Sequence, residues 1–349
     1  MYFLDPESIT CALIASKKKG SITMTRTRWG ILSTGNIAKK FAEGLTAVED
    51  AELVAVGSRS QEKADQFGDQ FKIPRRHAGY EALAADPDVD AIYVATPHPF
   101  HMDDTLLCLK HGKAVLCEKP FAINVAQAEK MIAFARRKKV FLMEAMWTHY
   151  FPAMAKVREL IAQGAIGEVR LAKADFCFRA KLNPEGRLFN PHLGGGALLD
   201  VGVYTLAFAH MVFNKGPASL SSTAHLGQTK VDEQCAMILG YKGGAMAVLT
   251  CAVRTNAPHE AVIYGTDGWI RIPPLFWQPD RIVVCRGNKE KELTFPRLGN
   301  GYSYEAVEVG RCLRQGKLQS DIMPHAKTLS IMRTMDALRK QWRLKYPGE

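Results

Sequence analysis

The sequence predicts an α/β protein of two domains: a doubly wound parallel sheet, then an α+β domain with a large, mostly antiparallel, open-faced sheet. At 349 residues the chain is too long for one ordinary hydrophobic core. From Thr27 onward, apolar runs of strand length alternate with helical patterns, as a parallel α/β sheet requires. After Trp147 the sequence becomes strand-rich with hairpin turns, which marks the second domain.

The first domain is expected to hold parallel strands covered by helices on both faces. Runs such as AIYVAT and AVLC are apolar throughout, which is typical of strands that are buried on both faces. The expected strands span residues 28–33, 52–57, 91–96, 114–117 and 140–144. The expected helices span residues 36–45, 61–71, 101–111 and 124–138.

The second domain is expected to begin with a helix and to continue as a sheet built from hairpins. Asp267-Gly268 and Gly287-Asn288 fall between strand patterns, where hairpin turns are expected. The first helix spans residues 154–163, and strand-rich sequence spans 168–178, 245–254, 261–272 and 281–295. A helix at 196–213 and an amphipathic helix at 326–344, which can pack against either domain, complete it.

These patterns divide the chain into an extension at residues 1–25, a first domain at 26–147 and a second at 148–349. In the extension the lysines follow the short apolar stretch, the reverse of a secretory signal. Met24 directly precedes the first strand pattern, so the extension is either disordered or an artefact of an upstream start.

Composition excludes several classes of protein. The content of 47% hydrophobic and 23% charged residues is that of a soluble globular protein, and no apolar run is long enough to span a membrane. The net charge of +11 is spread along the chain, which favours anionic ligands and not nucleic acid. The eight cysteines form no C-x-x-C pair, which indicates reduced thiols in a cytoplasmic protein and no metal site.

Residues 33–38, Ser-Thr-Gly-Asn-Ile-Ala, lie between a strand and a helix and nearly spell the glycine fingerprint of a dinucleotide-binding Rossmann turn. We call them the nucleotide turn. Gly35 allows close approach of a pyrophosphate, and Ala38 is an accepted substitute at the packing position. Ser33 replaces the first glycine and fits if its φ is negative. The expected cofactor-binding residues here are Ser33, Thr34, Gly35, Asn36 and Ile37.

The end of the second strand indicates which dinucleotide binds. An NAD site usually carries an acid there, whereas an arginine accommodates the 2′-phosphate of NADP. Arg59 stands at this position between Ser58 and Ser60, with Lys63 nearby, and no acid occupies the strand end. An ordinary surface arginine is the alternative. We expect NADP, with NAD possible.

Two further strand ends carry polar side chains. Thr96, Pro97, His98 and His101 follow one strand, and we expect this loop to line the nicotinamide end of the cofactor. His98 and His101 lack a third ligand of suitable spacing for zinc. Glu118, Lys119 and Pro120 follow the next strand, where Lys119 either points into the ligand crevice or belongs to a simple turn.

Together these residues resemble the glucose–fructose oxidoreductase and inositol dehydrogenase (Gfo/Idh/MocA) family, in which a Rossmann domain precedes an open-faced α/β domain. The matching motifs are the nucleotide turn, T-P-H-x-x-H at 96–101, E-K-P at 118–120 and G-G-G-A-L-L-D-V-G-V-Y at 194–204. The stretches LCEKPFAIN, FLMEAMWTHYFPA and GYSYEA look most like the branch with dimeric trans-dihydrodiol dehydrogenases and NADP-dependent D-xylose dehydrogenases. The resemblance covers residues 28 to about 345.

The resemblance implies a dehydrogenase mechanism. Tyr204 would exchange the proton of a substrate hydroxyl, and Lys119 would lower the pKa of Tyr204 and bind the same oxygen. Asp200 lies four residues before Tyr204 on the expected helix, so both project from one face, and Asp200 would orient the substrate or the lysine. A helix cap and a core tyrosine are the alternative interpretation of this pair.

Trp147, His149, Tyr150 and Trp277 are expected walls of the substrate pocket, with core packing as the alternative for each. At His149 the sequence departs from an arginine of the dihydrodiol enzymes. The expected substrate is a small polyol, an aldopyranose such as xylose first and a trans-dihydrodiol second. A reductase or cofactor-recycling oxidoreductase and a non-catalytic NADP-binding sensor remain alternatives. The family also implies a homodimer or higher oligomer through the second sheet.

Overall fold

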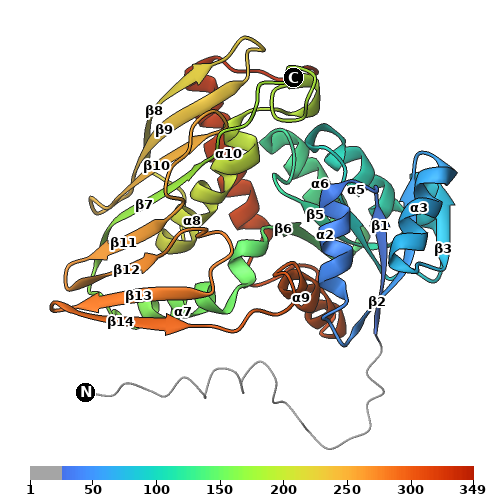
Figure 1. Cartoon of the computed structure of the whole chain (residues 1–349), viewed down its shortest axis with the longest axis horizontal. Helices are drawn as coiled ribbons and strands as arrows, with labels where there is room; N and C mark the ends of the chain where they lie inside the picture. Colours follow the sequence, from blue (N-terminus) through green and yellow to red (C-terminus); the bar gives the residue numbers. More distant parts are fainter. Residues whose placement is uncertain (1–25) are drawn as a thin grey trace, which may run out of the picture.

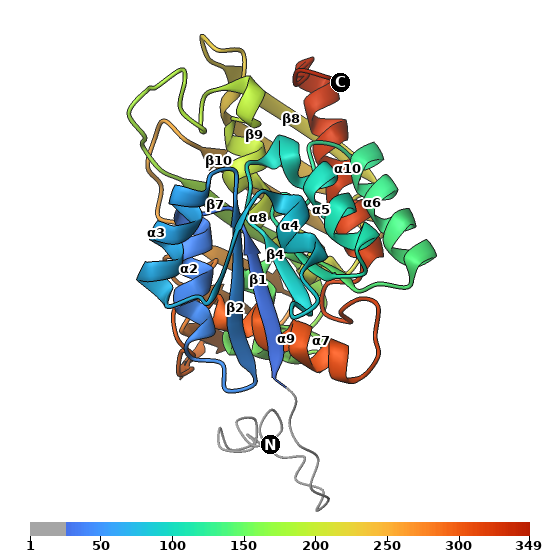
Figure 2. The same cartoon turned by 90° about the vertical axis from the view of Figure 1, so that its right-hand side faces the viewer.

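The computed structural model describes residues 26–349, so the predicted extension at 1–25 lies outside the described residues. Two sheets dominate the molecule, with helices between and around them (Figure 1). The N-terminal sheet is seen edge-on with its helices in Figure 1, and turning the molecule brings this domain to the front (Figure 2). The expected combination of a parallel and a mostly antiparallel sheet is confirmed.

The N-terminal sheet has six parallel strands in the order β3-β2-β1-β4-β5-β6. The strands are β1 (Thr27–Leu32), β2 (Ala51–Ser58), β3 (Arg75–Ala78), β4 (Ala91–Val94), β5 (Ala114–Glu118) and β6 (Leu142–Ala145). Chain order reverses between β1 and β4, which is the switch point where doubly wound sheets bind ligands. Every residue of β4 and β5 is buried, as their apolar sequences predict.

Helices cover both faces of this sheet. They are α2 (Asn36–Leu45), α3 (Gln61–Phe71), α4 (Tyr80–Ala85), α5 (His101–Lys110) and α6 (Val125–Lys138). Ser60 and Asn124 cap α3 and α6 through their side-chain oxygens, which fixes where these helices begin. The pair β3 and α4 was not predicted, because RRHA lacks an apolar pattern and α4 has only six residues.

The second sheet has eight strands in the order β14-β13-β12-β11-β7-β10-β9-β8. The strands are β7 (Val169–Cys177), β8 (Ser219–Leu226), β9 (Asp232–Gly240), β10 (Met246–Ala252), β11 (Ala261–Gly265), β12 (Gly268–Ile272), β13 (Arg281–Arg286) and β14 (Lys289–Thr294). Only β7 and β10 pair in parallel among them. Both predicted hairpin turns are confirmed, because β11 joins β12 and β13 joins β14.

The helices of the second half lie between the two sheets and along the N-terminal domain. They are α7 (Pro152–Ala162), α8 (Val203–Phe213), α9 (Ser303–Arg314) and α10 (His325–Trp342). The expected amphipathic helix is α10, and it packs against both domains: α6 on one side, α8 and β8 on the other. The helix α9 packs against α2, and the Ser303 hydroxyl donates to the Gly44 carbonyl at 2.7 Å. The two halves therefore share one continuous core.

One helical stretch in residues 26–349, Pro191–Phe213, is long and apolar enough to cross a membrane. Its apolar window is 94% buried inside the protein, and α8, which ends this stretch, is buried from Val203 to Val212. A helix that is apolar all round and surrounded by protein is a core helix of a soluble domain.

Candidate active site

Lys119 follows β5 directly, and its ammonium group meets a segment of the second domain. Lys119 Nζ donates to the Asp200 carbonyl oxygen at 3.0 Å and lies 3.8 Å from Asp200 Oδ1. Arg187 Nη1 lies 2.7 Å from the same carboxylate oxygen. One carboxylate thus faces two cations at the edge of the parallel sheet where the strands end.

Asp200 sits on a wide turn, not on the regular helix that the sequence predicts. Residues Leu198–Gly202 form a π-helical turn, η4, which continues into α8. Asp200 and Tyr204 nevertheless lie on the same side, next to Lys119. Lys119 Nζ contacts Asp200 and also lies 4.7 Å from the centre of the Tyr204 ring. π-Turns of this kind recur at functional sites.

The electrostatic balance keeps Asp200 charged. Burial opposes ionisation of Asp200, but Lys119 and Arg187 outweigh it and lower the pKa of Asp200 to about 2. Burial lowers the pKa of Lys119, while Asp200 and Glu118 act in the opposite direction. Arg187 was missed, because the loop that carries it has no periodic pattern.

Tyr204 is held by Trp147, whose indole Nε1 donates to the Tyr204 hydroxyl at 2.9 Å. The expectation that Lys119 lowers the pKa of Tyr204 is wrong for this structure. Burial raises the pKa of Tyr204 well above 10, and nearby Tyr302 and Glu118 add to the effect. The physical reason is position, because the ammonium lies over the ring face and the phenol is buried beside acidic groups.

A row of aromatic rings extends from Tyr204 in two directions. Trp277 stacks on Phe176 at 3.6 Å between ring centres, and Phe176 contacts the Tyr204 ring at 5.3 Å. On the other side, Trp147 stacks on Tyr302 at 4.1 Å with an angle of 8° between the planes. Trp147 and Trp277 were predicted as pocket walls, whereas Phe176 and Tyr302 were not, because single aromatic residues carry no local functional signal.

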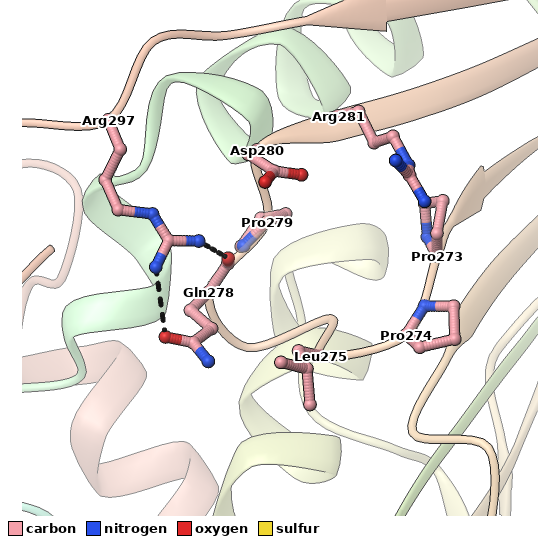
Figure 3. Close-up of a pocket in the computed structure, with 8 residues that line it drawn as sticks. All are labelled: Pro273, Pro274, Leu275, Gln278, Pro279, Asp280, Arg281 and Arg297. Carbon is pink, nitrogen blue, oxygen red and sulfur yellow. Dashed lines mark hydrogen bonds between the residues drawn. The ribbon is translucent and has the colours of Figure 1, made fainter. Parts of the chain in front are cut away.

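The loop of Trp277 is held in place from both sides. The Thr148 hydroxyl donates to the Trp277 carbonyl at 2.8 Å. Arg297 donates to the Gln278 carbonyl at 2.7 Å and to its side-chain oxygen at 3.3 Å, as Figure 3 shows. The small surface hollow in Figure 3 is formed by this loop, and Lys119, Asp200 and Tyr204 do not line it. We therefore place the chemistry at Lys119 and not in this hollow.

His98 and His101 join neighbouring loops to the site. His98 Nδ1 lies 3.2 Å from the Gly194 carbonyl, and His98 interacts electrostatically with Asp200 and Lys119. His101 contacts the Pro120 carbonyl through Nδ1 at 2.9 Å and the Thr96 carbonyl through Nε2 at 2.8 Å. Burial lowers the pKa of His101 to about 4, and the neutral ring donates to one of these two carbonyls, because it carries a single N–H.

His149 and Tyr150 point elsewhere. His149 Nε2 faces the Ala207 carbonyl at 3.2 Å, and burial lowers the pKa of His149 well below 6.5. The Tyr150 hydroxyl donates to Met143 Sδ at 3.1 Å. Both side chains are buried, so their contacts in this structure are core contacts and differ from the pocket-wall position that the sequence predicts.

The nucleotide turn differs from the prediction at Ser33, whose φ is +98° and not negative. The turn therefore keeps the backbone of the missing glycine, and the Ser33 hydroxyl interacts with the Tyr80 side chain, a contact that glycine lacks. Gly35 is the N-cap of α2, and a Cβ atom added there would meet only the Ser33 Oγ, at 3.9 Å. Thr34, Asn36 and Ile37 are at least partly accessible, while Ala38 is fully buried, as its packing role requires.

The end of β2 presents an accessible cation. Arg59 is exposed, and it acts electrostatically on Tyr80 and on Asp104. Ser58 is buried, and Ser60 accepts a hydrogen bond from the backbone of Lys63 at 3.4 Å, so the Ser60 hydroxyl caps α3. The Thr96 hydroxyl, next to the switch point, donates to Asp104 at 2.7 Å, so its hydrogen is already used in this bond.

The residues present fit a bound dinucleotide. The N-terminus of α2 is open above Gly35, its first turn contains no acidic residue, and backbone N–H groups at such a terminus attract phosphate. Lys119, Asp200 and Tyr204 lie at the same end of the sheet. A dinucleotide cradle at the strand ends that also carry Lys119 defines the class of the protein, an NAD(P)-dependent dehydrogenase.

Comparison with known proteins gives the family. Residues 27–146 match the oxidoreductase family with an NAD-binding Rossmann fold, and residues 154–271 match the GFO/IDH/MocA C-terminal domain. The chain belongs to this family. It is 41% identical over 332 residues to trans-1,2-dihydrobenzene-1,2-diol dehydrogenase of Xenopus tropicalis, covering 92% of this chain and 99% of that protein.

Solved structures give the same fold. An aldose-aldose oxidoreductase from Caulobacter crescentus complexed with glycerol is 25% identical, with a TM-score of 0.84 over 91% of this chain and 98% of its own. A 3-ketoreductase from Actinomadura kijaniata in complex with NADP and TDP-benzene is 26% identical, with a TM-score of 0.80 over 90% and 97% of the two chains. The family expected from the sequence motifs is confirmed.

Glu144, in β6 close to the site, gives a test of these electrostatics. It is buried, accepts a hydrogen bond from Thr328 at 2.8 Å, and has its pKa raised by burial from 4.5 to about 7. The unfolded chain ionises this carboxyl above about pH 4.5, whereas the folded protein keeps it protonated until about pH 7. Glu144 therefore costs stability increasingly as the pH rises through this window, up to roughly 3 kcal/mol.

We predict that the Glu144→Gln variant gains thermal stability relative to wild type as the pH rises from 5 to 8. Thermal unfolding of both proteins at the two pH values measures this. Acids that do not interact with Glu144 are common to both proteins, so their contributions cancel in the difference, whereas Glu118, which acts on Glu144, contributes with it. An unchanged difference in Tm between the two pH values would contradict the raised pKa.

Proposed function

We propose that this dehydrogenase transfers a hydride between NADP and the hydroxyl-bearing carbon of a small polyol. The observation that carries the proposal is the convergence of the Lys119 ammonium, the Asp200 carboxylate and the Tyr204 ring beside a row of aromatic rings. The nucleotide turn and Arg59 lie at the strand ends of the same sheet, where ligands of this fold bind.

The preference for NADP rests on Arg59. Its guanidinium is exposed at the end of β2, where a ribose 2′-phosphate is expected, and it offers planar paired donors to a phosphate. No acidic side chain occupies residues 57–60 to receive a ribose 2′-hydroxyl instead. The Actinomadura 3-ketoreductase of similar structure is described in complex with NADP, which supports the proposal by analogy.

The chain's own residues handle the proton. When bound, the nicotinamide supplies or accepts the hydride. Lys119 donates a hydrogen bond to the substrate oxygen, and its pKa is already lowered by burial, so its proton is more easily transferred. The Tyr204 phenol keeps its own proton near neutral pH and donates a hydrogen bond to the alkoxide that forms when a carbonyl is reduced, while Lys119 transfers the proton.

In the oxidising direction the proton follows the reverse path. Lys119 in its amine form takes the hydroxyl proton, and Tyr204 forms the second hydrogen bond to the substrate oxygen. The Trp147 N–H donates to the Tyr204 oxygen at 2.9 Å and so holds the phenol in place. Asp200 holds the Lys119 side chain in this position through its carbonyl and its carboxylate.

The substrate class follows from the aromatic row and the relatives. Aromatic ring faces stack on the apolar faces of sugars and on a cyclohexadiene ring alike, and Trp277 is the partly accessible ring of this row, whereas Trp147 and Phe176 are buried. The 41% identity to a trans-dihydrodiol dehydrogenase favours a trans-dihydrodiol, and the likeness to an aldose-aldose oxidoreductase favours an aldopyranose such as xylose. The likeness to the aldose-aldose oxidoreductase also agrees with the alternative of a cofactor-recycling enzyme, in which the nucleotide stays bound through both half-reactions.

The function is tested by absorbance at the NADPH band with a panel of trans-dihydrodiols, aldoses and simple diols, in both directions and with both cofactors. We expect turnover with at least one cyclic diol or aldopyranose. Lys119→Met and Tyr204→Phe should each lower kcat by roughly a hundredfold or more while NADPH binding, measured by fluorescence, is unchanged. NADPH binding without turnover of any substrate would instead make the protein a nucleotide sensor.

Cofactor choice has its own prediction. Arg59→Ala should weaken NADP binding by roughly tenfold to a hundredfold, because one charge-assisted contact to the 2′-phosphate is lost, and should leave NAD binding nearly unchanged. Calorimetric titration with the two oxidised cofactors measures both effects. Arg286→Ala, which removes an exposed arginine from β13, serves as the control. Equal losses for NADP and NAD would refute the role of Arg59.

Assembly and location complete the proposal. Ile238, Met246 and Val248 are exposed on β9 and β10, and we infer that the open face of the second sheet pairs with a second copy of the chain. A sedimentation run that shows only monomer would contradict the inferred pairing of the second sheet. All seven cysteines of residues 26–349 are free and buried, which fits the reducing cytoplasm.

A further inference from the structure

The turn that carries Asp200 is preceded by three glycines, residues 194–196, which we call the triple-glycine segment. Gly194 and Gly196 have φ values of +68° and +117°, which side chains other than glycine rarely adopt. A Cβ atom on Gly195 would lie 2.9 Å from the Leu188 carbonyl oxygen, and one on Gly196 would lie 2.3 Å from Asp232 Oδ1. The segment is therefore closely surrounded on several sides.

The triple-glycine segment connects the turn of Asp200 with the loop of Arg187. Its N–H groups at Gly195 and Gly196 donate to the carbonyls of Asn190 and Leu188, which belong to the loop of Arg187. The carbonyl of Gly196 accepts from the backbone N–H of Asp200 at 3.3 Å. A shift of this segment therefore moves Asp200 and Arg187 relative to Lys119.

Side chains from three distant parts of the chain fix this segment. His98, after β4, contacts the Gly194 carbonyl at 3.2 Å. The hydroxyl of Tyr346, which follows α10, donates to the Gly195 carbonyl at 2.6 Å. Asp232, at the start of β9, accepts from the Leu198 N–H at 2.6 Å through Oδ2, so it caps the turn η4.

Tyr346 is itself held firmly. Its ring is buried, and the Arg339 guanidinium lies 5.1 Å from the ring centre. The Glu349 carboxylate accepts from Arg339 at 2.7 Å and from the Tyr346 N–H at 2.8 Å. It also accepts from Asn124, the cap of α6, at 2.8 Å. Residues 346–349 thus join the N-terminal domain, α10 and the triple-glycine segment.

We propose that Tyr346 and Asp232 are positioning residues of the active site, which set the triple-glycine segment and, through it, the contact of Asp200 with Lys119. Neither side chain reaches the reacting groups. Each acts on the backbone that carries Asp200, Tyr346 through the Gly195 carbonyl and Asp232 through the first N–H of the turn. This inference rests on the proposed function only for its kinetic readout.

The test uses the NADPH-loaded full chain and the Tyr346→Phe variant, which keeps the ring and its contact with Arg339 but loses the bond to Gly195. We expect faster amide hydrogen exchange in peptides covering residues 187–204, and a roughly tenfold lower kcat at unchanged NADPH affinity. Tyr241→Phe is the matched control, because Tyr241 is also buried and its hydroxyl has no hydrogen-bond partner among the described residues.

Asp232 gives a second, independent pair of variants. Asp232→Asn keeps an oxygen that accepts from Leu198 and should retain most turnover, whereas Asp232→Ala should lose it together with the exchange protection of residues 198–204. Such rescue by the conservative variant separates positioning from bulk stability.

If the Tyr346→Phe variant shows the same hydrogen exchange in residues 187–204 as wild type, the proposal is overturned, whatever its activity. So would faster exchange with an unchanged kcat, or a Tyr241→Phe control that behaves like Tyr346→Phe. Hydrogen exchange needs no substrate, so a wild-type protein without turnover would end the proposed function and still leave this test decisive for the link between Tyr346 and Asp200.

Discussion

The contact between Lys119 and Asp200 is the interaction on which the site depends, because it joins the two domains at the point of chemistry. Lys119 directly follows a strand of the parallel sheet, and Asp200 belongs to a turn of the second domain. Lys119 donates to the Asp200 carbonyl at 3.0 Å, so backbone as well as charge determines where the ammonium lies. Any element that moves the Asp200 turn therefore also moves the ammonium.

Burial strengthens the contact between Lys119 and Asp200 and shifts the pKa values of the groups around it. Lys119, Asp200, Glu118 and Tyr204 are all largely removed from water, which strengthens their mutual interactions and shifts each pKa. Asp200 stays ionised because Lys119 and Arg187 face it, whereas Tyr204 stays protonated because burial and neighbouring acids outweigh the Trp147 hydrogen bond. One cluster thus holds a fixed anion, a cation with a lowered pKa and a neutral phenol.

The sequence predicts most of this fold but only part of the site. Apolar strands such as β4 and capped helices such as α3 have local signals, whereas β3 and the half-exposed β8 have none, because their pattern reflects a sheet edge. Lys119, Asp200 and Tyr204 stand in motifs of a known family. Arg187, Phe176 and Tyr346 come into contact with them or with their turn only through tertiary packing, which no local spacing encodes.

The backbone conformations show the same limit. The +98° φ of Ser33 and the π-turn at Leu198–Gly202 are imposed by the surroundings against the preference of the local sequence.

A double-mutant cycle on kcat/KM with Lys119→Met, Asp200→Ala and the double variant tests the central contact most directly. If Asp200 acts through the ammonium, the double variant should be no slower than Lys119→Met alone. Losses that multiply would show that Asp200 acts independently of Lys119 and would contradict the account.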